Sequence, residues 1–160
     1  MEIREVKIEK KDNLNIILGQ SHFIKTVEDL YEVMAQSSPS AKFGIAFNEA
    51  SGDRLIRYDG NDDKLINMAI KNMKKIGAGH SFIIVMDDIF PINCLNQIKD
   101  VPEVCRIFAA TANPISVIVT ENKNGCGIVG VIDGYSPVGV ENEEKKKERK
   151  ALLRNIGYKR

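Results

Sequence analysis

The alternation of apolar and polar residues predicts two pairs of strands in the first part of the chain. Residues 2–10 alternate between polar and apolar side chains, which is typical of an edge strand, and residues 14–19 form an apolar run. A short polar turn separates these two segments, so we expect them to pair as a hairpin. Residues 41–50 and 53–60 predict a second hairpin across a Ser-Gly-Asp turn.

Two segments have the apolar period of amphipathic helices, residues 26–36 and residues 61–76. The second segment also carries the signals that begin and end a helix. Asn61 or Asp62 can cap its first turn, which is acidic, and two lysines lie in its last turn. Gly77 follows as the residue that ends the helix.

The second half of the chain continues to alternate between the two kinds of element. Strands are predicted at residues 80–86, 105–112, 115–121 and 126–134, and helices at residues 91–100 and 141–157. Residues 80–86 are almost continuously apolar, so we place this strand at the centre of a sheet. We therefore predict a mixed α/β (α+β) fold: one domain over residues 1–160, with a mixed sheet, hairpins and about four flanking helices.

Composition narrows the class of protein. The 160 residues include 23 Lys and Arg against 22 Asp and Glu, and no Trp, so neither a broad basic surface nor a base-stacking platform for nucleic acid is expected. No apolar run is long enough to span a membrane, and we expect a cytoplasmic protein without a membrane partner. Cys94, Cys105 and Cys126 are widely spaced, which predicts buried free thiols in a reducing compartment.

Three familiar site motifs do not fit. Residues Gly125–Gly130 match G-x-G-x-x-G, but they follow a turn and lie within a predicted strand with no helix after it. The chain has no G-x-x-x-x-G-K-[ST] sequence, so ATP binding by a P-loop is excluded. With two histidines and no cysteine pair, a zinc site is not expected.

The candidate chemistry therefore lies in polar stretches at the ends of strands. His80 follows Gly79 and precedes a buried strand, so its ring is either a neutral nucleophile or base, or a core histidine bonded to a backbone carbonyl. For His22 a capping or packing role is favoured. Asp87 and Asp88 either hold Mg²⁺ beside phosphates or simply end a strand.

Several long blocks of sequence carry a resemblance to one family. They include GQSHF, FGIAFNEASGD, IGAGHSFII, FPINCLNQIKDVPEV, ATANPISVIV, GVIDG and ERKALLRNIGYK, in this order between Val6 and Lys159. In these blocks the chain closely resembles the adenosine-specific kinases of archaea and thermophiles. The resemblance implies a homo-oligomer, with three or six subunits favoured, that binds adenosine or adenine nucleotides and transfers phosphate from ATP, with Mg²⁺ as a candidate metal.

The matching blocks also supply candidate site residues, whose individual roles we infer from their chemistry. His80 is the candidate catalytic residue, through a phosphorylated imidazole. The candidate nucleotide-binding residues come from the matching blocks: Asn48, Glu49, Gly77, Gly79, Asn93, Asn96, Asn113 and Asp133. For the phosphate charges, Lys42, Arg54 and Arg57 are equal candidates. Two other readings stay open: a non-catalytic adenine-nucleotide sensor or binding module, and a structural protein whose polar loops are only turns.

Overall fold

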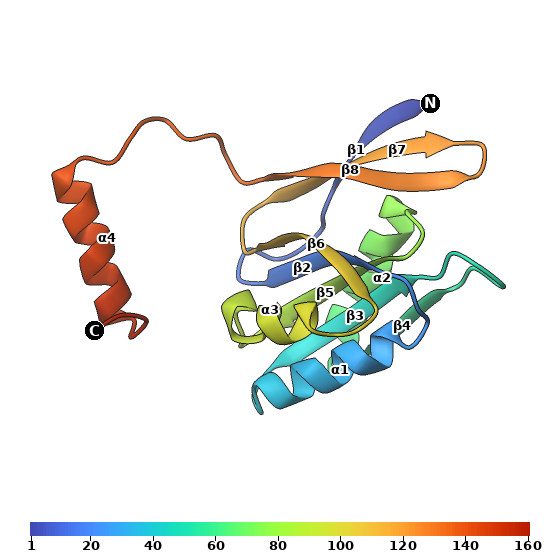
Figure 1. Cartoon of the computed structure of the whole chain (residues 1–160), viewed down its shortest axis with the longest axis horizontal. Coiled ribbons are helices and arrows are strands. Elements are labelled where there is room, and N and C mark those ends of the chain that lie inside the picture. Colours follow the sequence, from blue (N-terminus) through green and yellow to red (C-terminus); the bar gives the residue numbers. More distant parts are fainter.

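A computed structural model describes all 160 residues, which form eight strands and four helices (Figure 1). In chain order these are β1 (Glu2–Lys7), β2 (Asn15–Ser21), α1 (Thr26–Ser37), β3 (Lys42–Asn48), β4 (Ile56–Gly60), α2 (Asp63–Ile76), β5 (Ser81–Asp87), α3 (Pro91–Lys99), β6 (Val104–Thr111), β7 (Ile115–Asn122), β8 (Gly125–Asp133) and α4 (Glu143–Asn155). The predicted α+β class with about four helices is confirmed. None of the helices is long and apolar enough to cross a membrane.

The strands divide into two antiparallel sheets rather than one mixed sheet. Five strands form the larger sheet in the order β4-β3-β5-β2-β6, and three form the smaller in the order β1-β7-β8. The strand β5 lies at the centre of the larger sheet, as its continuous apolar sequence predicts. The expected β3–β4 and β7–β8 hairpins are both present.

The predicted pairing of residues 2–10 with residues 14–19 is wrong. The strand β1 pairs with β7 in the smaller sheet, whereas β2 lies between β5 and β6 in the larger one. Burial explains the difference, because six of the seven residues of β2 are buried and require cover on both faces. In β1 only Val6 is buried, so this strand suits a sheet with one face in solvent.

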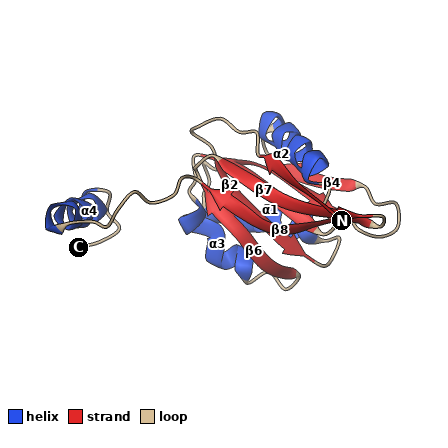
Figure 2. Cartoon of the chain, turned by 90° about the horizontal axis from the view of Figure 1, so that it is seen from above, coloured by secondary structure: helices blue, strands red, loops and turns tan.

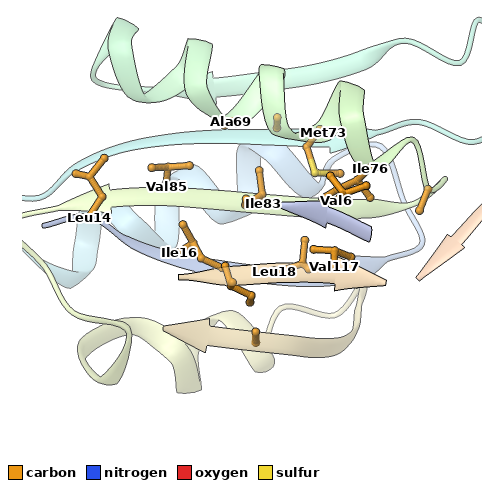
Figure 3. Close-up of a cluster of buried hydrophobic side chains, with 14 of the residues drawn as sticks. Val6, Leu14, Ile16, Leu18, Ala69, Met73, Ile76, Ile83, Val85 and Val117 are labelled. Atoms are coloured by element: carbon orange, nitrogen blue, oxygen red, sulfur yellow. The ribbon is translucent and has the colours of Figure 1, made fainter. Parts of the chain in front are cut away.

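One layer covers each face of the larger sheet, so the fold has three layers (Figures 1 and 2). Alternate residues of each strand point to opposite faces. On one face, Ile17 and Ile45 pack with α1 and α3. On the other, Ile16 and Ile83 pack with α2 and with the inner face of the smaller sheet, in the cluster drawn in Figure 3.

The helix α2 packs very close to β3, and local caps bound it at both ends. A Cβ atom on Gly44 would lie 2.2 Å from the backbone of Leu65, so only glycine fits there. The carboxylate of Asp62 accepts hydrogen bonds from the amides of Lys64 and Leu65 at the start of α2. Gly77 ends the helix in the left-handed conformation, with φ of 67°.

The helix α4 stands apart from the layers, at the end of the extended residues 134–142 (Figures 1 and 2). None of its residues is buried, in keeping with its highly charged sequence. The three cysteines are free, as expected, but only Cys94 is buried. The expectation of burial is wrong for Cys105, which is exposed because its side chain lies on the outer part of an edge strand.

Candidate functional site

At one end of the larger sheet, the turn from α2 into β5 lies beside the ends of β3 and β2. The amide of His80 donates to the carbonyl of Asn48 over 2.7 Å, and the amide of Ser21 donates to the carbonyl of His80 over 2.9 Å. These bonds hold His80 with φ of 61°, in the left-handed region. Such a conformation is costly for a residue with a Cβ atom, and it is found most often at functional sites.

The imidazole of His80 is held on two sides. Its ring stacks on Phe47 with a centroid distance of 5.8 Å and an interplanar angle of 12°. Its Nε2 atom lies 3.5 Å from Oε1 of Glu49. The side chain of His80 is 32% exposed, so the ring is partly buried, as expected, and still open to solvent on one side.

The carboxylate of Glu49 is itself fixed in place. Its side chain is only 8% exposed, and Oε1 accepts hydrogen bonds from the amides of Ala50 and Ser51 at 3.0 and 3.4 Å. Burial raises the pKa of Glu49, but the two amides and His80 outweigh it and bring the pKa below its ordinary value. Glu49 is therefore ionised at neutral pH and can accept a proton or hydrogen bond from the imidazole.

The amide of Asn48 has one free acceptor atom. Its Nδ2 donates to the carbonyls of Met73 and Ala78, both over 3.1 Å. Because two carbonyls face Nδ2, the orientation of the amide is unambiguous. The Oδ1 atom is buried and has no hydrogen-bond partner, and a buried unpaired acceptor is costly. Asn48 belongs to the wall of a cavity, so a small adjustment of the wall would let a donor on a bound molecule reach this atom.

This first cavity has a volume of about 740 Å³, which suits a nucleoside or nucleotide. It lies between the end of α2, the loop that follows β3 and the β7–β8 hairpin. Its lining includes Asn48, Glu49, Ala50, Arg54, Ile56, Met73, Lys74, Gly77, Gly79, Thr120, Glu121, Asn122, Cys126 and Gly127. The four candidate residues Asn48, Glu49, Gly77 and Gly79 are thus brought together, with His80 next to Glu49.

The polarity of the cavity differs between its two sides. The carbonyl end of α2 faces it, and a helix C-terminus carries partial negative charge, which favours hydrogen-bond donors. Arg54 and Lys74 supply positive charge, against Glu49 and Glu121.

Gly79 packs against Ala50 so closely that a Cβ atom would lie 2.9 Å from that residue, and its exposed amide donates to no backbone carbonyl.

An arginine that the sequence could not single out is linked to the imidazole through Phe47. Arg57 of β4 is the direct cross-strand partner of Phe47, so both side chains lie on the same face of the sheet. Phe47 in turn stacks on His80. The Nε atom of Arg57 is buried and has no hydrogen-bond partner. Of Lys42, Arg54 and Arg57, the candidates for neutralising the phosphates, Arg57 is the one that adjoins the aromatic partner of His80.

The remaining candidate residues lie at the opposite end of the sheet. They are Asp87, Asp88, Asn93, Asn96, Asn113 and Asp133. A seven-residue strand such as β5 is about 20 Å long, so these residues are not in contact with His80. Asn93 caps α3 by accepting the amide of Phe90 over 3.1 Å. Asn113 donates to the carboxylate of Asp133 over 3.2 Å.

Two other expectations concern metal and His22. No group of three or more His, Cys, Asp or Glu side chains is arranged to hold a metal ion. Asp87 accepts a hydrogen bond from the amide of Asp88 over 3.0 Å, which is typical of a carboxylate that ends a strand.

The side chain of His22 is exposed, so the expected packing role is wrong. Only its backbone forms a hydrogen bond, in which the amide donates to the carbonyl of Glu103 over 3.0 Å.

Comparison with known proteins agrees with this fold and defines the class of protein. A sequence model of the family described as adenosine specific kinase matches residues 6–159, so the chain belongs to that family. The structure also resembles the crystal structure of the PH1918 protein from Pyrococcus horikoshii OT3, with a TM-score of 0.96 and 46% sequence identity. That similarity covers 99% of this chain and 98% of the other. No curated protein matches the sequence.

Proposed function

We propose that the first cavity binds adenosine and adenine nucleotides, and that His80 carries the phosphoryl group during transfer from ATP to adenosine. The family description supports an activity of this kind. The observation that carries the proposal is a cavity wall that holds Asn48, with its unpaired buried Oδ1 atom, and Glu49, the partner of a constrained histidine. A chain without a P-loop must position and neutralise the phosphates with other groups, and a histidine beside the cavity is also able to receive the phosphoryl group.

The cavity suggests how a nucleoside would be oriented. The Oδ1 atom of Asn48 and the carbonyl end of α2 both favour donors, such as the exocyclic amine of adenine or the ribose hydroxyls. The phosphates would lie on the side of His80, where the free amide of Gly79 and the guanidinium of Arg54 can neutralise charge. Guanine carries a carbonyl in place of the adenine amine, so it would fit less well.

In the proposed first step, Glu49 holds the N–H at Nε2 of His80, which leaves the lone pair of Nδ1 free to attack. A bond forms between Nδ1 and the γ-phosphorus of ATP, the bond from that phosphorus to the bridging oxygen breaks, and ADP leaves. In the second step an adenosine hydroxyl attacks the phosphorus, the P–N bond breaks, and the hydroxyl proton passes to water or Glu49.

Magnesium would assist by neutralising the phosphates, as it does in other kinases. Asp87 and Asp88 do not fit this task in the first cavity, because they lie at the other end of β5. The carboxylates that line the cavity are Glu49 and Glu121, and they are the side chains that would hold such an ion.

The decisive experiment incubates the protein with ATP and adenosine and follows both AMP and the protein mass. We expect AMP to form, and an acid-labile addition of one phosphate to appear on the protein when adenosine is omitted. Guanosine should give little product. Absence of AMP formation, together with an unchanged protein mass, would refute the proposed transfer.

A second candidate function is an adenine-nucleotide sensor without turnover. It is favoured by the small number of cations in the cavity wall, Arg54, Lys74 and the amino group of Met1, which Glu49 partly offsets. The other carboxylate of the wall, Glu121, pairs with Arg4 over 3.6 Å. Little positive charge is therefore left to neutralise a triphosphate. In that case adenosine and ATP would raise the melting temperature without any AMP being formed. A ligand at 100 times its Kd should add about 2.7 kcal/mol to the free energy of unfolding.

We also propose that the protein is a homo-oligomer, with three or six subunits favoured. The supporting feature is the segment between β8 and α4, in which Tyr135, Val138 and Val140 are almost fully exposed. The backbone amides of residues 135–141 make no hydrogen bond within the chain, so the segment is free to pair with another subunit. Sedimentation should give a mass well above the 17.9 kDa of one chain.

A further inference from the structure

A second cavity, of about 650 Å³, lies at the end of the larger sheet opposite His80. It is bounded by the start of α3, the ends of β2 and β6 and the C-terminal tail that follows α4. Its apolar lining consists of Phe90, Pro91, Ile92, Ala110, Ala112, Ile156 and Tyr158, and its polar lining of Asn15, Thr111 and Asn113. No charged side chain lines it, so it is suited to a neutral molecule.

Asn15 is the residue that points to a ligand. It lies on the same face of β2 as the core residue Ile17 and is only 6% exposed. Its side-chain amide makes no hydrogen bond with the rest of the chain, although it lines the cavity. Its amide oxygen and nitrogen stay accessible, so this amide offers both a donor and an acceptor to a molecule in the cavity.

A second amide at the rim is held in a fixed orientation. The Nδ2 atom of Asn113 donates to Oδ1 of Asp133 over 3.2 Å, and its backbone amide donates to the hydroxyl of Thr111 over 3.0 Å. The Thr111 hydroxyl donates to the same Asp133 oxygen over 2.7 Å. These bonds leave the Oδ1 atom of Asn113 as a free acceptor in the wall that also contains Asn15.

The apolar walls come from two parts of the chain that are otherwise far apart in the fold. Phe90 and Ile92 belong to the start of α3, whereas Ile156 and Tyr158 belong to the tail, and all four are about half exposed or more. The helix α4 buries none of its own residues. A helix of this length is only marginally stable without contacts, so a molecule that joins the two walls would stabilise it.

We propose that this second cavity binds a neutral planar heteroaromatic ring, such as a purine base, and that the bound ring fastens the tail to the body of the protein. The ring edge would be read by the amides of Asn15 and Asn113, and its faces would contact Phe90 and Tyr158. The site lies about 20 Å from His80, so it is separate from the transfer centre and does not depend on the proposed chemistry there.

Hydrogen exchange of residues 143–158 tests this proposal, with adenine as the probe. We expect adenine to slow exchange in this segment at least fivefold in the wild-type protein and in Tyr58→Ala, whose exposed side chain on β4 lies outside the cavity. The same addition should produce no slowing in Tyr158→Ala or Phe90→Ala. Unchanged exchange in the wild type, or equal slowing in all four proteins, would overturn the second site.

Parallel measurement of phosphate on His80 keeps the two proposals apart. Tyr158→Ala should still form the acid-labile phosphate with ATP, since its side chain lies at the other end of the sheet. If transfer fails in every protein while adenine still protects residues 143–158, the second site stands and the proposed transfer does not. If phosphoryl transfer persists while adenine gives residues 143–158 no protection, the proposed transfer stands and the second site does not.

Discussion

Replacement of His80 separates the role of its backbone conformation from that of its ring. With φ of 61°, residue 80 is in the left-handed region, which costs about 1–2 kcal/mol for most residues but is tolerated by Asn and Gly. Any replacement also loses the stacking on Phe47, worth about 0.5–1.5 kcal/mol. His80→Ala should therefore unfold more readily than His80→Asn or His80→Gly, by about 1–2 kcal/mol.

For a chain of 160 residues this difference corresponds to a melting temperature roughly 2–8 °C lower for His80→Ala than for His80→Asn. Thermal unfolding by circular dichroism measures it directly. Phosphoryl transfer should be lost in all three variants, because none has an imidazole nitrogen to attack the phosphorus. Adenosine affinity should fall by no more than about tenfold, or 1.4 kcal/mol, because the nucleoside is held elsewhere in the cavity.

Two results would refute this reasoning. Equal melting temperatures for the Ala and Asn variants would show that the left-handed conformation at residue 80 costs nothing. Full turnover by His80→Asn, with no acid-labile phosphate on the wild-type protein after incubation with ATP, would show that His80 is a structural histidine. The wild-type protein incubated with ADP in place of ATP is the matched control for the mass measurement.

Three further outcomes are expected. Because the folded state lowers the pKa of Glu49 below its ordinary value of 4.5, ionised Glu49 stabilises the fold above that pH, and this contribution fades as the pH falls through the lower folded pKa. The difference in melting temperature between wild type and Glu49→Gln should therefore shrink on acidification. A constant difference would contradict the lowered pKa of Glu49. Arg57→Gln should reduce the yield of phosphohistidine more than Arg54→Gln does, as mass spectrometry would record, whereas equal loss would remove the special role of Arg57. Gly44→Ala should lower the free energy of unfolding by about 1–3 kcal/mol in a urea titration, since its Cβ would meet the backbone of α2, and an unchanged midpoint would be contrary to that contact.

The sequence alone determined the local elements. The cap at Asp62 and the glycine at position 77 bound α2 because both act through neighbouring backbone groups. The central place of β5 followed from its continuous apolar residues, since only a strand covered on both faces needs them. The exposure of α4 likewise followed from its charges.

Only the tertiary structure decided which distant residues meet. The partner of β1 depends on which sheet can bury Val6, and this is a property of the whole core rather than of the turn that follows the strand. In the same way, β5 and β6 are both antiparallel to β2 and so run in one direction, which puts His80, before β5, and Asn113, after β6, at opposite ends of the sheet. The stack of His80 on Phe47 and the unpaired amide of Asn15 arise from these long-range pairings, for which the local sequence carries no signal.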